Sequence, residues 1–419
     1  MSASNNGPLK VLHFADAHID IANYGRHDPD SGLPVRVVDF LRALDQIVDA
    51  AIAEDVDLVL FAGDAYKDRN PQPTFQREWG KRMMRLSQAG ISTLLLVGNH
   101  DVSPAVQRAH TLQEYQTLAV PNLRVAERLD LLGPDQLGVP VQVIALPWVS
   151  RSAMLTRADM SGKSSDEVLA ILEERVAGGV EQLLAQRDDS LPLILLAHAS
   201  VRGLGATFSS ERAVMLGHEL TLGGSLVRDK RWDYVALGHI HKHQSLNDGR
   251  HPPIVYPGSI ERIDFGEARE KKGFILAEVA KGRTTWTFRP LQTRQFIDLD
   301  VETPDSDTFM ADVMRQLPSQ ERVADAICRV RLSYPRDWEP LLDEAAIYDY
   351  FAQALSIQIQ KHRLVDRRSR LGDAAGVESL PPDELLATYW RTIDLDEEES
   401  AAMQALATEI LAAVDSEPA

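Results

Sequence analysis

Six short apolar runs stand out along the chain, each rich in Val, Leu and Ile and continuous rather than alternating with polar residues. Such runs are typical of strands that are covered on both faces. Between them, apolar positions recur with helical spacing over residues 37–52 and 164–186, and Ser164 with Glu167 forms a capping box at the start of the second segment. Strands that alternate with helices predict a layered α/β domain. The six runs are residues 9–15, 56–62, 92–97, 140–146, 191–197 and 232–237.

The pattern of apolar and polar positions changes from about residue 273 onward. Residues 273–291 predict a hairpin that turns at Lys281-Gly282-Arg283, and a helix over 307–317 and a strand over 326–334 follow. A linker at 373–382 then leads to two amphipathic helices, 382–391 and 397–414. We therefore expect four parts in the chain. They are a disordered tail at 1–8, an α/β domain at 9–285, a small α+β domain at 286–372, and a linker with a helical tail at 373–419.

Length and composition fit an ordinary globular chain with two or three domains. The chain has 419 residues, of which 44% are hydrophobic and 25% charged. No apolar stretch approaches the roughly 20 residues that cross a bilayer, and the N-terminus lacks the basic and apolar regions of a signal peptide. Cys328 is the only cysteine, which excludes an intrachain disulfide and a thiolate metal cluster. We expect a cytoplasmic protein without a membrane contact.

The net charge of −18 argues at first sight against nucleic acid as a partner. Its distribution changes this conclusion, because residues 366–419 contain 13 acidic and 4 basic residues. Half of the negative excess therefore lies in the last part of the chain. The remainder leaves room for a local basic surface or for a cleft that metal ions make positive.

Polar side chains with lone pairs follow five of the six predicted strands. In open α/β sheets the carboxyl ends of the strands meet at one crevice, so these five groups should converge in space. Glycines at 63, 98 and 238 let the backbone turn sharply at three of the strand ends. The residues concerned are Asp16 and His18, Asp64, Asn99 and His100, His198, and His239 and His241.

Two carboxylates, one amide and several imidazoles without sulfur suit Mn²⁺, Fe²⁺ or Zn²⁺. Asp64 stands alone after its strand and is the natural bridge between two ions. Each motif taken singly is also compatible with a structural turn or a buried histidine, and only the complete ordered set favours a metal centre. The other histidines are interpreted as structural; they are His13, His27, His110, His218, His243, His251 and His362.

The motifs "DAH", "GDAYKDR", "GNHD", "AHAS" and "GHIH" resemble the five signatures of the calcineurin-like metallophosphoesterases. Within that superfamily, residues 256–274 resemble the segment after the last motif in the SbcD-type nuclease subunit, of the meiotic recombination eleven family of DNA double-strand-break repair nucleases. The resemblance covers nearly the whole chain. It implies a layered β-sandwich domain flanked by helices, a small α+β capping domain and a C-terminal helical tail.

The resemblance also implies roles for the residues at the strand ends. One metal would be held by Asp16, His18, Asp64 and His241, and the other by Asp64, Asn99, His198 and His239. His100 would be the catalytic histidine, and the cofactors would be two Mn²⁺, with Fe²⁺, Mg²⁺ or Zn²⁺ as alternatives in one position. Lys67 departs from relatives that have a second histidine there. Whether Lys67 contacts a phosphate or is an ordinary surface lysine stays open.

The function that the resemblance implies is that of a two-metal-dependent DNA nuclease. It would act as a 3′-to-5′ exonuclease and single-strand endonuclease within an SbcCD-like double-strand-break repair complex. One alternative is a phosphomonoesterase or phosphoprotein phosphatase, since the same metal ligands serve those reactions. A catalytically silent scaffold is a third hypothesis, which the complete ligand set disfavours.

Three partners are expected besides the metal ions. DNA is the substrate, an SbcC-type coiled-coil ATPase would bind the C-terminal helices, and a second copy of the chain would pack on helices near 73–86 and 106–118. The apolar face of residues 73–86 would either form this dimer contact or pack in the core of the chain itself. The basic segment 361–370 would contact DNA phosphates or form a solvated charged face.

Overall fold

The computed structural model describes residues 7–102, 109–149, 161–209, 221–303, 306–364, 382–390 and 397–415. The chain divides into two compact units. The first comprises Met1–Leu299, Leu317–Val330 and Ala345–Ile359, and the second comprises Asp300–Gln316, Arg331–Glu344 and Gln360–Ala419. None of the helices in the described ranges is both long and apolar enough to cross a membrane. The domain boundaries expected after 285 and 372 stay predictions.

The first unit contains a six-stranded sheet with the order β14-β13-β1-β2-β3-β4. Strands β1 to β4 are parallel, while β13 pairs antiparallel with β1 and with β14. The hairpin predicted over 273–291 is therefore confirmed as β13 and β14. The strands are β1 (Leu9–Phe14), β2 (Leu58–Phe61), β3 (Ser92–Leu96), β4 (Leu123–Ala126), β13 (Gly273–Ala280) and β14 (Arg283–Pro290).

A second six-stranded sheet of the first unit has the order β11-β12-β10-β7-β6-β5. Its central strands β6, β7, β10 and β12 are parallel, and β5 and β11 are antiparallel edge strands. The strands are β5 (Asp130–Leu132), β6 (Gln142–Leu146), β7 (Leu193–His198), β10 (Tyr234–Gly238), β11 (Gln244–Ser245) and β12 (Ile254–Tyr256). A two-stranded sheet pairs β8 (Ser200–Arg202) with β9 (Thr221–Gly223).

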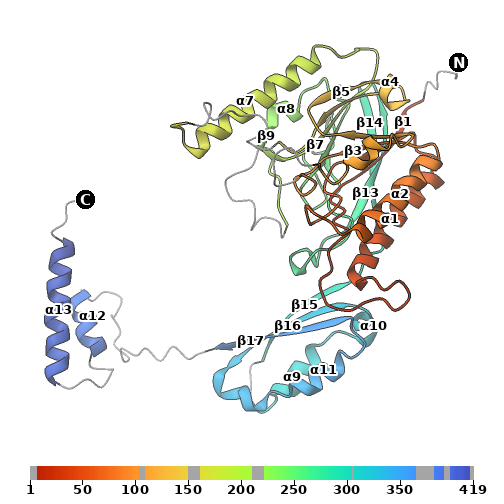
Figure 1. The fold of residues 1–419 in the computed structure, drawn as a ribbon. Helices are drawn as coiled ribbons and strands as arrows, with labels where there is room; N and C mark the ends of the chain where they lie inside the picture. Colours follow the sequence, from red (N-terminus) through yellow and green to blue (C-terminus); the bar gives the residue numbers. More distant parts are fainter. Residues whose placement is uncertain are drawn as a thin grey trace. The chain divides into compact units, whose positions relative to one another are not determined.

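Three apolar clusters show that the two sheets pack face to face with helices outside them. Leu60 of the first sheet and Ile194 of the second share the cluster between the sheets. The outer face of the first sheet packs against α1 (Val35–Ala53) and α2 (Pro73–Gln88). The outer face of the second packs against α7 (Ser165–Leu184). The predicted α/β fold with a layered sandwich flanked by helices is confirmed (Figure 1).

The start of α7 follows the predicted capping box. The hydroxyl oxygen of Ser164 accepts the backbone N–H of Glu167 at 3.3 Å, and the Glu167 carboxylate accepts the N–H of Ser164 at 2.7 Å. Both bonds satisfy donors that would otherwise lack a partner at a helix start. The sequence therefore fixes where this helix begins.

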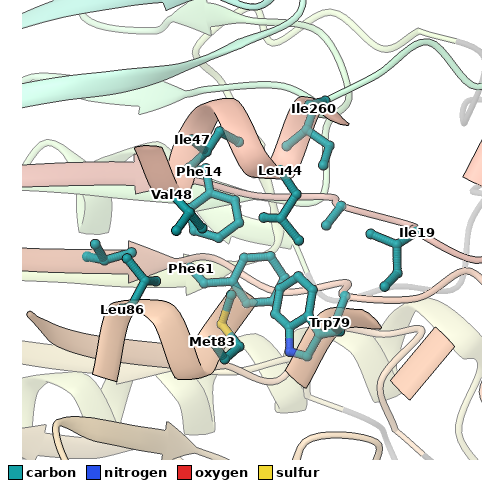
Figure 2. Packing of buried hydrophobic residues seen from close by; sticks show 14 of the residues in the cluster. Phe14, Ile19, Leu44, Ile47, Val48, Phe61, Trp79, Met83, Leu86 and Ile260 are labelled. Atoms are coloured by element: carbon teal, nitrogen blue, oxygen red, sulfur yellow. The ribbon is translucent and has the colours of Figure 1, made fainter. Parts of the chain in front are cut away.

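The apolar face of α2 is used inside the chain. Trp79 and Met83 are fully buried and Leu86 nearly so, and they pack with Phe61 and Leu44 beneath α1 (Figure 2). These side chains belong to the core, as the packing alternative for residues 73–86 states. The homodimer consequently draws no support from them and stays a prediction.

A three-stranded sheet has the order β15-β16-β17, and each of its strands has residues in both units. In the second unit, the Phe309 ring contacts the rings of Tyr334 and Trp338 at centroid distances of 5.4 and 5.8 Å. The last two helices, α12 (Pro382–Trp390) and α13 (Glu397–Asp415), pack against each other. The three strands are β15 (Phe296–Glu302), β16 (Ile327–Pro335) and β17 (Ser356–Leu364).

The other elements in the described part of the chain are short helices, of which α9 is the longest. They are α3 (Gln113–Thr117), α4 (Pro134–Leu137), α8 (Gly224–Val227), η2 (Phe265–Glu267), α9 (Phe309–Gln316), α10 (Gln320–Val323), η3 (Arg336–Leu341) and α11 (Glu344–Tyr350).

Candidate metal centre

All eight residues predicted at the strand ends come together between the two sheets. Three groups come from the carboxyl ends of β1, β2 and β3 in the first sheet, and two from β7 and β10 in the second. The side chains are buried, except that Asn99 and His100 are half-buried. The residues are Asp16, His18, Asp64, Asn99, His100, His198, His239 and His241.

One group of possible ligand atoms belongs to Asp16, His18 and His241, with one donor atom of each within 4.8 Å of the others. The Nε2 atoms of His18 and His241 face each other at 3.2 Å. The backbone N–H of His239 donates to both carboxylate oxygens of Asp16 at 3.1 Å, which fixes the carboxylate between the sheets.

A second group belongs to Asp16, Asp64 and His198, again within 4.8 Å, so Asp16 takes part in both groups. The Oδ1 atom of Asn99 lies 2.9 Å from Nε2 of His198 and 3.0 Å from Nδ1 of His239. The amide oxygen and the two imidazoles thus surround the same small space.

Asp64, a member of the second group, also lies near His18 of the first group. Its Oδ2 atom is 3.8 Å from Nε2 of His18 on one side and 3.5 Å from Nε2 of His198 on the other. Its Oδ1 atom accepts the backbone N–H of His100 at 2.8 Å. This position is the one that a bridging carboxylate needs, and the bridging role remains our proposal.

Donor chemistry and burial both fit divalent cations. Oxygen and imidazole nitrogen donors without sulfur suit Mn²⁺, Fe²⁺ or Zn²⁺. Two buried carboxylates and two opposed imidazole nitrogens would repel one another without a positive charge among them. The residues present therefore fit a centre for two metal ions.

His100 lies beside these groups. Its Nδ1–H donates to the backbone carbonyl of Lys67 at 2.8 Å, and its Nε2 lies 3.5 Å from Nζ of Lys67. The ring also meets the edge of the His18 ring at a centroid distance of 5.2 Å. The structure thus brings the predicted catalytic histidine and the predicted phosphate contact together at the edge of the cluster.

A model of the calcineurin-like phosphoesterase family matches residues 9–243, more than half of the chain. This chain belongs to the calcineurin-like phosphoesterase family. The family uses a centre for two metal ions, in agreement with the donor groups described above.

Individual proteins similar to this phosphoesterase include the DNA double-strand break repair protein Mre11 of Archaeoglobus fulgidus. The two are 24% identical over 360 residues, which cover 81% of this chain and 72% of the archaeal protein. Among solved structures, TT1561 of Thermus thermophilus is 16% identical, with a TM-score of 0.38 over 67% of this chain and 99% of that one. A dimetal phosphatase from Danio rerio is 12% identical, with a TM-score of 0.39 over 68% and 97%.

Four of the predicted ligands of this phosphoesterase have left-handed backbone conformations. Asp16, His18, Asp64 and His239 have φ values of 52°, 40°, 64° and 98°. Such values are uncommon for residues other than glycine and are concentrated at functional sites. The periodicity of the sequence carries no signal for this strain.

Two glycines permit the close approach that the turns require. A Cβ atom on Gly98 would lie 2.2 Å from Oδ1 of Asp64, and one on Gly238 would lie 2.0 Å from the carbonyl oxygen of Ala62. Both distances are shorter than any van der Waals contact. At Gly98 a side chain would displace the Asp64 carboxylate, whereas at Gly238 it would collide with the main chain after β2.

Burial and mutual charge shift the pKa values of the predicted ligands. Burial raises the pKa of Asp16 to about 7, against the opposing effect of the nearby histidines. Burial acts to lower the pKa of His198, but the adjacent Asp64 carboxylate outweighs it and raises the value to about 9. For Asp64, burial acts upward, but His198 holds the pKa well below its usual range. Near neutral pH the metal-free centre therefore holds protons that a cation must displace.

Asp101, the last residue of the "GNHD" motif, has no role among the predicted ligands. Its carboxylate is fully buried and accepts the N–H groups of Asp64 and Gly98, both at 2.9 Å, and of Ala65 at 3.1 Å. It also accepts the hydroxyl of Thr111 at 3.0 Å. Asp101 thereby joins the turns after β2 and β3. Its only sequence signal is its place directly after His100.

A second residue without an earlier role is Glu267. Its Oε1 atom lies 2.9 Å from Nδ1 of His241 although 26 residues separate them in the chain. The residue lies inside the segment 256–274, whose resemblance to nuclease subunits concerns the segment as a whole and assigns no role to a single side chain.

A cavity of about 1020 Å³ adjoins His100. Its lining includes the exposed side chains of Lys67 and Arg69 and the half-buried ring of Phe75. The acidic groups Asp20 and Asp68 line it as well. Asp20 accepts two backbone N–H groups of the loop that carries these residues, so it holds the loop in place.

We expect Mn²⁺ to bind more tightly as the pH rises from about 6 to about 8.5, because protons on Asp16 and His198 compete with the metal below their pKa values. Binding near pH 7.5 should release protons. Titration calorimetry in two buffers of different ionisation enthalpy measures both effects. An affinity that does not change with pH would contradict the assignment of these ligands.

The Gly98→Ala substitution should weaken Mn²⁺ binding, because the added Cβ displaces the Asp64 carboxylate. Gly178→Ala in α7 is the matched control, since nothing lies within 4 Å of a Cβ there. The control should retain full metal affinity and gain up to about 1 kcal/mol of stability from helix propensity. Calorimetry and thermal unfolding of both variants test this, and equal metal affinity in the two would contradict it.

Proposed function

We propose that this chain is a two-metal-dependent DNA nuclease, a 3′-to-5′ exonuclease and single-strand endonuclease of the SbcD type. The observation that carries the proposal is the convergence of five strand ends, four of which provide the two donor groups that share Asp16. DNA as the substrate is supported by the similarity to an archaeal double-strand break repair protein. That similarity covers 81% of the chain and so extends beyond residues 9–243.

The centre would take two divalent cations, held by Asp16, His18, Asp64 and His241 and by Asp64, Asn99, His198 and His239. When bound, such ions provide Lewis acidity toward the phosphate ester and lower the pKa of water. Mn²⁺ is the metal that we propose, with Fe²⁺, Mg²⁺ or Zn²⁺ as alternatives in one position.

His100 is proposed to transfer a proton to the leaving sugar oxygen. The bond from its Nδ1–H to the Lys67 carbonyl orients the ring, so that Nε2 is the atom available for proton transfer. Burial lowers the pKa of His100, and the nearby Lys67 ammonium contributes in the same direction. An incoming phosphate anion would raise this pKa again, because an opposite charge favours the imidazolium. The substrate would thereby favour the protonated form of the ring.

Lys67 is proposed to contact the phosphate. Its Nζ lies beside Nε2 of His100, and both residues line the same cavity. With Arg69 it gives that wall two cations, while Phe75 offers a ring on which a base can stack. Asp20 and Asp68 line the same wall, so the support for a nucleic acid strand comes from the Phe75 ring and from the position of Lys67 beside His100, not from a net positive charge.

A phosphomonoesterase or phosphoprotein phosphatase is the alternative, because the same donors serve both reactions. A labelled DNA oligonucleotide and a nitrophenyl monoester, each tested with Mn²⁺, separate the two functions. We expect DNA cleavage to dominate. Preferential hydrolysis of the monoester would support the alternative, and activity toward neither substrate would favour the silent scaffold.

The variants His100→Ala and Asp64→Ala test the division of roles. His100→Ala should keep its bound Mn²⁺ and lose roughly 10²–10⁴-fold in the cleavage rate, as expected for a lost proton-transfer group. Asp64→Ala should lose both metal and cleavage. Metal analysis alongside the oligonucleotide assay measures this. An Asp64→Ala protein that retained both metals would show that the bridging assignment is wrong.

The C-terminal helices are proposed to bind the coiled coil of an SbcC-type ATPase. Met403, Leu406 and Ile410 share one face of α13 and are 41%, 53% and 54% exposed. Helical spacing predicts Val414 on the same face and a capping box of Asp396 with Glu399, but the side chain of Val414 and the whole of Asp396 lie outside the described part of the chain. An exposed apolar face of this kind is typical of a helix that binds a partner.

We expect Leu406→Glu to abolish binding of the SbcC-type ATPase from the same organism. Ala405→Glu is the control, because Ala405 is also exposed but lies on a different face of the helix. Neither change should alter Mn²⁺-dependent cleavage of an oligonucleotide by the isolated chain. Co-purification measures the binding, and equal loss in both variants would contradict the proposed face.

The basic segment 361–370 supports DNA binding less than the cavity does. Within β17, Lys361 is paired with Glu344 at 2.7 Å and Arg363 with Glu339 at 2.6 Å. These cations are therefore already neutralised, as the charged-face alternative expects. Residues 365–370 lie outside the described part of the chain.

A further inference from the structure

A buried series of polar and charged groups connects the metal centre with the segment 256–274. Oε1 of Glu267 is 2.9 Å from Nδ1 of His241, and Oε2 of Glu267 is 2.8 Å from Nζ of Lys272. Glu267 is fully buried, and Lys272 is 1% exposed. Two opposite charges in direct contact at such depth need a full set of hydrogen bonds to be tolerated.

Lys272 has that full set. Its ammonium contacts Glu267, donates to Glu270 at 2.8 Å and donates to the backbone carbonyl of His241 at 3.0 Å. These three partners account for its three N–H groups. Glu267 also accepts the backbone N–H of Ile263 at 3.0 Å. The pair is consequently rigid, and it holds the backbone and the side chain of His241 from two directions.

The identity of the partners decides which nitrogen of His241 carries the proton. A carboxylate beside an ammonium acts only as an acceptor, so Nδ1 of His241 must be the donor. The lone pair is then on Nε2, the atom that faces Nε2 of His18 at 3.2 Å. Glu267 thus presents His241 in the form that can bind a cation.

His241 differs in this respect from two other predicted ligands. Nδ1 of His18 lies 3.2 Å from the carbonyl of Tyr66, and Nδ1 of His198 lies 2.6 Å from the carbonyl of Ala62. A carbonyl fixes a tautomer, but a carboxylate also raises the electron density of the ring and so the basicity of its other nitrogen. His241 is therefore a stronger donor than His198, the histidine of the other cation position whose Nδ1 faces a carbonyl.

We propose that Glu267 is a positioning residue that selectively strengthens the cation position formed by Asp16, His18, Asp64 and His241, and that Lys272 holds it in place by balancing its charge. The inference rests on the proposed two-cation centre and does not depend on DNA being the substrate. It assigns the segment 256–274 a task in metal binding.

The test compares Glu267→Gln with Glu261→Gln. Glu261 is a matched control, because it is a 1% exposed glutamate of the same segment. Its carboxylate accepts the backbone N–H groups of Arg262 and Arg294 at 2.7 and 3.1 Å. Both substitutions remove one buried charge, but only Glu267→Gln changes the partner of a predicted metal ligand.

Titration calorimetry of the full chain with Mn²⁺ should resolve two binding events. Glu267→Gln should weaken one of them by roughly 10–100-fold, the usual effect of removing a carboxylate behind a ligating histidine. The other event should change little, and Glu261→Gln should alter neither. Crystals grown with limiting Mn²⁺ should lose anomalous density at the position beside His241.

A further variant guards against a fold defect in Glu267→Gln. Glu267→Asp keeps the charge beside Lys272 but shortens the side chain, so it should produce the same selective loss with near-normal thermal stability. Equal weakening of both events, or normal binding in both Glu267 variants, would overturn the inference. Wild-type protein that binds two Mn²⁺ but cleaves no DNA would refute the proposed nuclease and leave the role of Glu267 intact.

Discussion

The burial of two carboxylates side by side is the constraint on which the rest of this structure depends. Asp16 and Asp64 are almost completely withdrawn from water, a placement that costs several kcal/mol per charge unless partners surround them. The partners here are backbone N–H groups of His239 and His100 and the surrounding imidazoles. They come from turns after strands of different sheets. Two sheets therefore have to end at the same place before the centre can exist.

The donor groups of the centre are surrounded by further groups from several parts of the chain. Oxygen and imidazole donors at the strand ends suit any phosphate ester, and the family match rests on residues 9–243, which contain them. The cavity beside His100 and the segment that contains Glu267 lie next to these donors. The donors of the centre could serve many phosphate esters, while the groups around them belong to this chain's own loops and segments.

Much of this arrangement could be predicted from the sequence, for a physical reason. Apolar runs such as residues 92–97 are strands because both of their faces are covered, and a polar residue directly after such a run must lie at the end of a sheet. These runs do not show which strand belongs to which sheet. The cluster between the sheets and the clusters under the helices contain the same types of apolar residue. The roles of Asp101 and Glu267 depend on contacts that appear only when distant turns meet.

The near-contact of Gly238 with the carbonyl of Ala62 has a consequence for how the centre can vary. Here the main chain of β10 lies directly against the main chain that follows β2. The gap between the two sheets is set there by atomic radii, not by the sizes of core residues. Substitutions in the interior can therefore alter the stability of this sandwich while the span available to a pair of cations stays nearly constant.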